Sequence, residues 1–580
     1  MNLAAVMHRA NNEFCYALDK DTVVVTLKTA KDVESVDIIH EDPFIHELKG
    51  KREWFGKKAA MRKYLELERH YIWRIELKPP FKRLQYYFEI KGGGMKYAVF
   101  ENKIVPVSKI RETSIICFKF PWLNPTDVIA PPEWVRDTVW YQIMPERFAR
   151  SSDFVNDGRF RDWGDVRNRH WYDKYGGSLR GITEKLPYLH ELGITGIYMT
   201  PIFRSPSSHK YDTTDYKCID PDFGTEDDIR ELVEKAHGYG IRIMLDAVFN
   251  HCGRLNPIWL DVRERGKDSP YYNWFFINKD NFAEEERPTD DGRFYSFSFW
   301  SVMPKMNTNN PEVVQYFTEL STYWVQNWGI DGIRFDVGDE VSHSFMKSVY
   351  ASLKAVRPDV FLLGEIWYDS LPWVTSKEYD SVMNYPISGC ANDFFRHTGS
   401  DVRKLIYTLN FCRSLYPEQV TRVLFNFLDT HDTARASESC KNNDVLLQKL
   451  AFLLSLPGTP CLYYGTELAL RGTPQNLDYR QCMPWKKIND PDKKLMRENT
   501  AALIHLRNEN PAMRSNDIEF IIDDEKPGSV RYIKSGKLTV FLNASKQNFN
   551  MIPDGKILYS NCYENNTLYT NGILIWENIQ

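Results

Sequence analysis

Carboxylic acids recur at the ends of four apolar runs in the middle of this 580-residue chain. The runs are IRIML, GIRF, VFLLG and VLFNF, and each is followed within a few residues by an acid. An arginine precedes the second acid by two positions, and a histidine directly precedes the last one. The whole set comprises Asp246, Arg334, Asp336, Glu365, His431 and Asp432.

A single acid at the end of an apolar run is usually a turn cap or one half of an ion pair. Several such acids in one place are different, because converging carboxylates repel one another and raise some of their pKa values. Glycoside hydrolysis needs this arrangement, since one carboxylate attacks the anomeric carbon while a protonated partner acid delivers a proton to the leaving oxygen. The pattern therefore predicts a glycosidase site, provided that the fold brings the acids together.

The acids can meet if the apolar runs are strands of one closed sheet. Eight such runs alternate with amphipathic helical patterns, which predicts an α/β fold of the (β/α)8 TIM barrel type. Functional side chains of such a barrel gather at the C-terminal ends of its strands. A doubly wound open sheet is the alternative, but the chain has no glycine-rich phosphate loop to support it. The expected strands lie within 138–144, 193–200, 241–250, 332–337, 360–366, 381–385, 423–429 and 460–465.

Changes of pattern along the chain predict flanking domains. Residues 1–122 carry β-branched runs such as TVVVTLKTA and predict an N-terminal β-sandwich. The barrel is expected over 123–510, with an inserted domain at 252–308 after its third strand, where a long insertion lies on the catalytic face. Strand patterns return at 511–580 and predict a C-terminal β-sandwich.

Composition narrows the class of partner. The formal net charge is -4 and charges of both signs are spread along the chain, so nucleic acid and anionic membranes are not expected partners. The N-terminal apolar run is too short for an export signal and no later run could span a bilayer, which predicts a cytoplasmic protein. Ten cysteines without a CxxC pair fit reduced core thiols.

Four segments carry a resemblance to a known family. DAVFNH at 246–251, GIRFDVGDE at 332–340, GEIW at 364–367 and FLDTHD at 427–432 resemble, in order, the signature segments of the α-amylase family. The chain is similar in particular to the subgroup of neopullulanases, cyclomaltodextrinases and maltogenic amylases, because MPKMN at 303–307 resembles that subgroup's additional motif.

The resemblance implies a role for each matching residue. Asp336 corresponds to the nucleophile of a retaining mechanism, Glu365 to the general acid/base, and Asp432 to the third acid that binds hydroxyls of the distorted sugar. Asp246 corresponds to a structural support of the site. The residues that correspond to substrate contacts are Tyr211 in SHKYDTTDY, His251, Arg334, Glu340 in VGDEVSH, Trp367, His431 and Arg480.

The subgroup also implies substrates and an assembly. Its members suggest hydrolysis of α-1,4-glucosidic bonds in cyclodextrins, maltooligosaccharides and pullulan-type glucans, by a homodimer formed through the N-terminal domain. No cofactor is expected to be required. Two alternatives share the fold: a mainly transglycosylating 4-α-glucanotransferase, and a non-catalytic glucan-binding scaffold, against which the presence of all three acids argues.

The subgroup's calcium loop is altered in this chain. Of the residues that correspond to its ligands, Asp153, Asn156 and Asp157 are retained, whereas Ser151 and Ser178 replace two oxygen donors. Serine is a poor ligand for a hard cation, so a calcium requirement is not expected.

Overall fold

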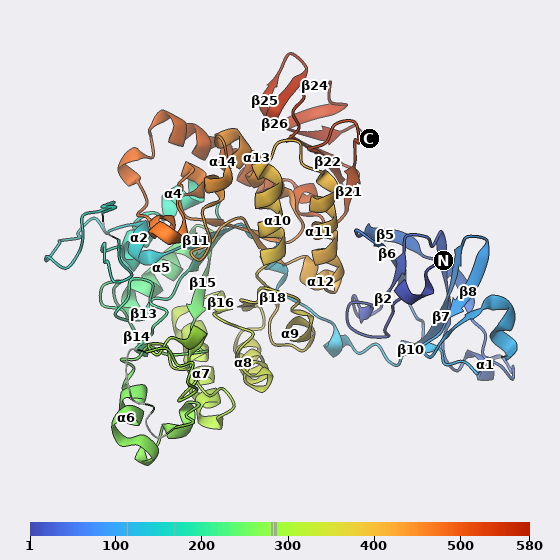
Figure 1. The fold of residues 1–580 in the computed structure, drawn as a ribbon, viewed down its shortest axis with the longest axis horizontal. Helices are drawn as coiled ribbons and strands as arrows, with labels where there is room; N and C mark the ends of the chain where they lie inside the picture. Colours follow the sequence, from blue (N-terminus) through green and yellow to red (C-terminus); the bar gives the residue numbers. More distant parts are fainter. Residues whose placement is uncertain (113, 168, 280–281, 283–286, 580) are drawn as a thin grey trace. The chain divides into compact units, whose positions relative to one another are not determined.

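The computed structural model describes residues 1–112, 114–167, 169–279, 282 and 287–579 of the chain. Contacts divide these residues into two units. Figure 1 colours the chain from its N-terminus in blue to its C-terminus in red. The first unit contains residues 1–130 and 402–421, and the second contains residues 131–401 and 422–580. A search of the described helices finds none that is both long and apolar enough to cross a bilayer.

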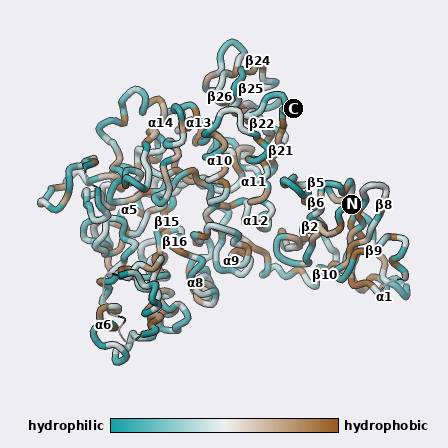
Figure 2. Tube along the Cα trace, viewed as in Figure 1, coloured by the Kyte–Doolittle hydropathy of each residue, from teal (hydrophilic) through white to brown (hydrophobic). Residues whose placement is uncertain are grey.

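The first unit is a sandwich of two antiparallel sheets. One sheet has the order β1-β2-β6-β5, and the other has the order β4-β3-β7-β8-β9 with β10 on β7. A single core takes side chains from both, such as Val25 and Trp73 from one sheet and Phe88 from the other, and Figure 2 shows hydrophobic stretches around β9 and β10. The expected N-terminal sandwich is therefore confirmed. The strands are β1 (Cys15–Ala17), β2 (Val23–Ala30), β3 (Ser35–Glu41), β4 (Lys57–Ala60), β5 (Arg62–Glu66), β6 (His70–Leu77), β7 (Leu84–Gly92), β8 (Met95–Val99), β9 (Ile104–Pro106) and β10 (Phe118–Phe120).

Two helices from much later in the chain belong to this same unit. They are α11 (Val402–Ser414) and α12 (Glu418–Thr421). The side chain of Asn410 donates to the carbonyl of Glu66 at 2.9 Å. Arg74 on β6, only 3% exposed, forms an ion pair with Glu418 at the start of α12. A side-chain hydrogen bond and an ion pair thus hold this helical segment against the N-terminal strands.

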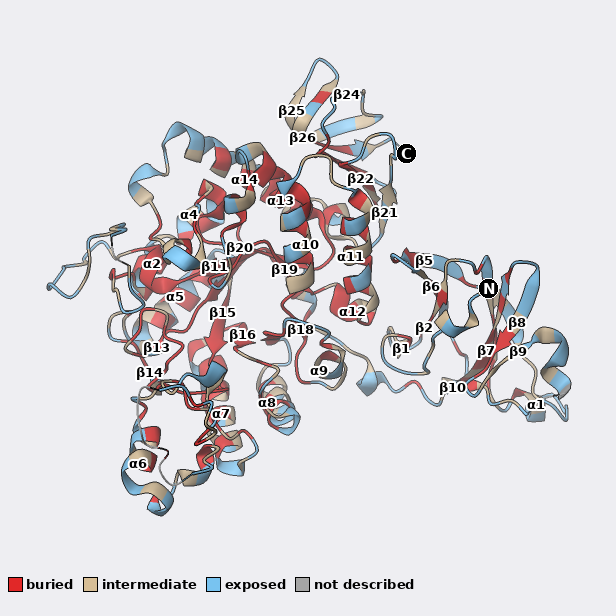
Figure 3. Cartoon of the chain, in the orientation of Figure 1, coloured by how far each residue is buried: buried red, intermediate tan, exposed pale blue. Residues whose placement is uncertain are grey.

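The second unit contains the expected barrel. Eight parallel strands run in the order β18-β17-β16-β15-β12-β11-β20-β19, and a parallel bridge from Met383 to Phe425 joins the two outer strands. All eight predicted strands are present, which confirms the α/β barrel. Figure 3 shows these strands buried, as expected for a barrel wrapped in helices. They are β11 (Trp140–Ile143), β12 (Gly196–Met199), β15 (Arg242–Ala247), β16 (Gly332–Phe335), β17 (Phe361–Gly364), β18 (Ser381–Val382), β19 (Phe425–Phe427) and β20 (Thr459–Tyr463).

Strand register sets where the acids lie. Asp246 on β15 is the partner of Arg334 on β16, and Phe335 is the partner of Gly364 on β17. Asp336 and Glu365 each follow directly after one of these paired residues. The two acids therefore leave neighbouring strands at the same level of the barrel rim.

Helices around the barrel follow the apolar periodicity of the sequence. The four apolar residues of α5 (Glu226–Gly238) are all buried, and Thr225 with Asp228 forms a capping box at its start. Asn310 caps α7 (Pro311–Tyr323) by accepting from Glu312 N at 2.8 Å. Two more helices of the barrel are α8 (His343–Val356) and α10 (Tyr385–Arg396).

The apolar residues Ile182, Leu186, Leu189 and Leu192 have the spacing of one helical face, but they do not lie on one helix. The segment divides into α3 (Leu179–Glu184) and α4 (Leu186–Glu191), with a break at Lys185. Pro187 explains the break, because proline has no N–H to donate to Thr183 and its ring crowds that carbonyl. The apolar side chains of both pieces are still buried.

The segment after β15 lacks long regular elements. It contains α6 (Pro257–Arg265), short 3-10 turns and isolated bridges, including one from His251 to Lys305. Residues 280, 281 and 283–286 of the expected insertion lie outside the described residues.

The chain ends in a second β domain. Its strands hydrogen-bond into one six-stranded antiparallel sheet, with the order β21-β22-β23-β26-β24 and β25 on β26. The sheet packs against helix α13 (Asn443–Ser455), and β25 also contacts α14 (Pro491–Glu509). The strands are β21 (Ile518–Ile521), β22 (Ser529–Lys534), β23 (Leu538–Asn543), β24 (Phe549–Asn550), β25 (Gly555–Glu564) and β26 (Thr567–Asn578).

Candidate active site

A cavity of about 680 Å³ opens at the C-terminal ends of the barrel strands. It collects nearly all of the residues that the sequence pointed to, although they are spread over more than 250 positions. Arg334 and Asp246 lie below its floor and are fully buried. The predicted site residues that line the cavity are Tyr211, His251, Asp336, Glu340, Glu365, Trp367, His431, Asp432 and Arg480.

One buried guanidinium organises three carboxylates. Arg334 Nη1 donates to both oxygens of Asp246, at 2.8 and 2.9 Å, and to Asp336 Oδ1 at 2.9 Å. Its Nη2 forms an ion pair with Glu365 Oε2 at 2.8 Å, without the angle of a hydrogen bond. Asp336 and Glu365 are thereby held side by side by the two terminal nitrogens of one planar group.

Asp246 has no oxygen left for a substrate. Besides Arg334, it accepts from the hydroxyls of Tyr198 at 2.7 Å and Tyr211 at 2.9 Å. Burial raises the pKa of Asp246, and the Arg334 charge together with the two tyrosine hydrogen bonds acts in the opposite direction. The side chain is 1% exposed and lies outside the cavity lining. Such a carboxylate can orient its neighbours, and it cannot reach a bound molecule.

Asp336 presents an oxygen to the cavity from strongly desolvating surroundings. Burial raises the pKa of Asp336, Arg334 lowers it, and the carboxylates of Glu365, Asp246 and Asp432 raise it again. Two acids this close do not ionise independently, because the second negative charge is repelled by the first. The nearby Glu365 carboxylate is thus one of the causes that raise the pKa of Asp336.

Glu365 is oriented by donors from three directions. Its Oε2 accepts from Val337 N at 2.9 Å, and its Oε1 accepts from Trp367 Nε1 at 3.2 Å and from the Tyr385 hydroxyl at 3.3 Å. The rings of Trp367 and Tyr385 stack 3.7 Å apart at 13°. Tyr385 was not predicted as a site residue, although it begins α10 shortly after the end of barrel strand β18, where functional side chains collect.

His431 is held as a neutral ring. The Gln142 amide nitrogen donates to its Nδ1 at 2.7 Å, so the ring hydrogen sits on Nε2, 3.0 Å from Asp432 Oδ2. Burial lowers the pKa of His431 well below its usual value, and Arg480 and Arg334 lower it further. Its ring also stacks on Tyr211 at 5.2 Å and 4°. Gln142 was not predicted, and its one signal was a lone amide within an otherwise apolar strand.

His251 closes the opposite wall of the cavity. Its backbone bridges to Lys305, and its ring stacks on Phe297 at 5.0 Å. Burial, with a further contribution from Lys305, lowers the pKa of His251 to about 3. Lys305 also forms an ion pair with Glu340 at 2.9 Å. Glu340 thus lies at the cavity rim with its charge already partnered.

Asp432 is the most open to solvent of the three predicted catalytic acids. Arg480 Nη2 donates to its Oδ1 at 3.1 Å, and Arg480 Nε donates to the carbonyl of His431 at 2.7 Å. The Asp432 side chain is 33% exposed, so its carboxylate remains accessible to hydroxyl groups in the cavity.

Comparisons with known proteins agree with this geometry. The family model described as "Alpha amylase, catalytic domain" matches residues 142–518, and the one described as "Alpha amylase, N-terminal ig-like domain" matches residues 1–124. The chain belongs to the α-amylase family. It is therefore a glycoside hydrolase by family.

Similar proteins of the α-amylase family cover almost the whole chain. A cyclomaltodextrinase from Geobacillus thermopakistaniensis is 39% identical over 94% of this chain and 92% of its own length. An intracellular maltogenic amylase from Bacillus subtilis is 38% identical over 92% and 89%. A solved structure titled "Cyclomaltodextrinase" superposes with a TM-score of 0.87 at 32% identity, covering 100% of this chain and 98% of that one.

The loop that resembles the family's calcium site is built around arginines. Asp153 forms an ion pair with Arg180 at 2.6 Å, and Asp157 forms one with Arg159 at 2.7 Å. The Asn156 side-chain oxygen accepts from the backbone of the same loop, and Ser178 caps α3. Within the described ranges, no three His, Cys, Asp or Glu side chains converge as a metal site. Positive charges beside these carboxylates do not fit a bound divalent cation.

Calcium removal is accordingly expected to have little effect. Treatment with EDTA should leave kcat and the melting temperature unchanged, because Arg180 and Arg159 already neutralise the two aspartates. An ion present at 100 times its Kd would add about 2.7 kcal/mol to the free energy of unfolding, and its loss would be visible in a thermal melt. A marked fall in either quantity, reversed by added calcium, would contradict the prediction.

Proposed function

We propose that this chain hydrolyses α-1,4-glucosidic bonds in cyclodextrins, maltooligosaccharides and pullulan-type glucans by double displacement. The observation that carries the proposal is the Arg334 guanidinium with Asp336 on one terminal nitrogen and Glu365 on the other. This arrangement supplies two adjacent carboxyls held by one guanidinium, as a retaining glycosidase requires. The names of the relatives support the substrate class.

The first step uses the two acids in opposite protonation states. Asp336, ionised and held by Arg334, attacks the anomeric carbon from below, while Glu365 donates its proton to the leaving glucosidic oxygen. A β-linked glucosyl ester of Asp336 forms, and the leaving chain departs with the proton. Asp432 and the neutral His431 and His251 bind hydroxyls of the same glucose unit as it flattens towards the oxocarbenium ion.

The second step reverses the roles. Glu365, now ionised, removes a proton from water as the water attacks the anomeric carbon, and the ester bond to Asp336 breaks. Two inversions return the product to the α configuration. Proton NMR of freshly released sugar should therefore show the α anomer first, and initial appearance of the β anomer would exclude this mechanism.

Cavity size bears on the choice of substrate. A site of about 680 Å³ fits a short oligosaccharide better than a branched polymer, and remote glucose units bound in it can help to lower the barrier at the reacting centre. We expect cyclodextrins and linear maltooligosaccharides to have a higher kcat/KM than soluble starch, with maltose as a main product. Specificity constants for these substrates under one condition test this. A tenfold preference for starch, about 1.4 kcal/mol, would contradict it.

Transglycosylation is a second candidate on the same scaffold. Trp367 lies beside the acid/base, 51% exposed, and offers an aromatic face to a sugar on the leaving-group side. A sugar held there would compete with water for the glucosyl ester. Product analysis at rising maltose concentration distinguishes the two activities, because transfer gives oligomers longer than the substrate.

We further propose a cytoplasmic homodimer formed through the N-terminal sandwich. One of the similar proteins is named an intracellular maltogenic amylase, and the sandwich matches the family's N-terminal domain. Light scattering of the intact chain should give twice the 68.1 kDa of one chain. A mass that stays at one chain across micromolar concentrations would refute the dimer.

A further inference from the structure

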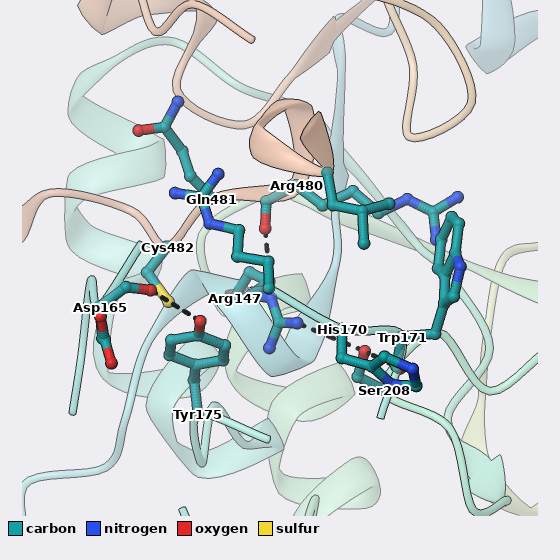
Figure 4. Close-up of a pocket in the computed structure, with 11 residues that line it drawn as sticks. Arg147, Asp165, His170, Trp171, Tyr175, Ser208, Arg480, Gln481 and Cys482 are labelled. Carbon is teal, nitrogen blue, oxygen red and sulfur yellow. Dashed lines mark hydrogen bonds between the residues drawn. The ribbon is translucent and has the colours of Figure 1, made fainter. Parts of the chain in front are cut away.

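Trp171 lies in the cavity wall but outside every segment that carries the family resemblance. It is 41% exposed, and it lines both the main cavity and a small pocket behind it. Figure 4 shows this pocket, with the Trp171 ring next to the Arg480 side chain. A large apolar ring that stays open to solvent in a substrate cavity can provide a surface for a sugar ring.

The backbone around Trp171 is fixed on both sides. Its carbonyl accepts from Ser208 N at 3.0 Å and from Ser208 Oγ at 2.7 Å. Arg147, itself 7% exposed, donates to the carbonyls of Asp173 at 2.9 Å and of Arg480 at 3.2 Å. One buried guanidinium therefore ties the Trp171 segment to the segment that carries Arg480, and Figure 4 draws the bond from Arg147 to the Arg480 carbonyl.

Neighbouring side chains fix the ring itself. The Arg480 guanidinium lies over one face, 5.1 Å from the ring centroid, and His209 meets it edge-on at 5.8 Å and 87°. The same Arg480 donates to Asp432. Trp171 is thus linked through a single residue to the acid that is placed to bind the glucose unit at the reacting centre.

Two aromatic surfaces then stand on different sides of the bond that breaks. Trp367 donates to Glu365, the acid that protonates the leaving oxygen, so it borders the sugar that departs. Trp171 is linked to Asp432 instead, which borders the sugar that becomes attached to Asp336. The contacts therefore place Trp171 on the non-reducing side of the cleavage point.

We infer that Trp171 is the stacking surface for the second glucose unit on the non-reducing side, and that it makes the enzyme release maltose units. The inference rests on the proposed function. Arg480, stacked on the ring and paired with Asp432, keeps the surface at a fixed distance from the first glucose unit. Stacking of the second glucose unit on Trp171 lowers the barrier to cleavage only when the substrate is bound with two glucose units on the non-reducing side.

Maltotriose labelled with ¹³C in its reducing-end glucose tests the inference. Cleavage with two glucose units on the non-reducing side gives labelled glucose, and cleavage with one gives labelled maltose. The wild type should give mainly labelled glucose. In Trp171→Ala the ratio of labelled glucose to labelled maltose should fall roughly tenfold, because the favoured position loses its stacking contact. Trp171→Phe should recover most of the ratio.

The ratio is insensitive to the amount of folded enzyme, since both products come from one substrate at one active site. An unchanged ratio in Trp171→Ala would overturn the inference, and so would a wild type that releases mainly labelled maltose. Failure of the wild type to cleave maltotriose at all would instead reject the proposed function. Substrate well below KM keeps transfer products out of the measurement.

Discussion

Asp336→Asn is expected to lose about 10⁴-fold or more of kcat on maltotriose, equivalent to about 5.4 kcal/mol of transition-state stabilisation. The amide keeps the shape of the side chain and one acceptor for Arg334, but it cannot form the glucosyl ester. Asp359→Asn is the matched control. Asp359 is exposed at the opposite end of the neighbouring strand, so its change should leave kcat intact.

Chemical rescue separates loss of the nucleophile from loss of folding. In Asp336→Ala with α-maltosyl fluoride, azide can enter the vacated space and attack the anomeric carbon directly. A single displacement gives β-maltosyl azide, the inverted product. Retention of more than about one per cent of wild-type kcat in Asp336→Asn, or formation of the α azide in the alanine variant, would contradict the nucleophile assignment.

Glu365→Gln is expected to lose activity on a substrate whose leaving group needs a proton and to keep the first step on a substrate whose leaving group does not. Hydrolysis of maltotriose should fall about 10²- to 10⁴-fold, because the leaving oxygen no longer receives a proton. Fluoride needs no proton to depart, so α-maltosyl fluoride should still react in the first step. The second step then slows, because no base activates water. Rapid-mixing measurements should show a burst of fluoride close to one equivalent of enzyme.

Asp336→Asn supplies the comparison for that burst, since it cannot form the intermediate and should give none. An equal loss on both substrates without a burst would show that Glu365 is not the acid/base. Arg334 would remain paired with Asp246 and Asp336 in Glu365→Gln, so a large drop in stability is not expected to obscure the result.

The barrel could be predicted because its determinants are local. Each strand is a short apolar run between turn residues, and Asp336 and Glu365 each follow directly after their run, so strand pairing alone brings these two acids together. The pairing of Arg334 with Asp336 followed from their two-residue spacing on one strand. The family resemblance added the roles, which the spacing by itself left open.

Residues that act through long-range contacts could not be predicted in this way. Gln142 reaches His431 across 289 positions, and Arg147 reaches the carbonyl of Arg480 across 333. Neither has a neighbour in the sequence that signals its partner. Trp171 was missed for a related reason: an exposed aromatic in an irregular segment has no periodicity, and only its position against Arg480 gives it meaning.

The helices α11 and α12 have a consequence for how the chain is made. They lie between the sixth and seventh barrel strands in sequence, yet they belong to one unit with residues 1–130, which are translated much earlier. Arg74 is therefore synthesised more than 340 residues before its partner Glu418. The N-terminal domain emerges with a face that stays uncovered until most of the barrel has been translated, while the last two barrel strands are still to come. The first unit can therefore be completed only after most of the barrel has been translated. An N-terminal deletion would leave these helices without their partner surface.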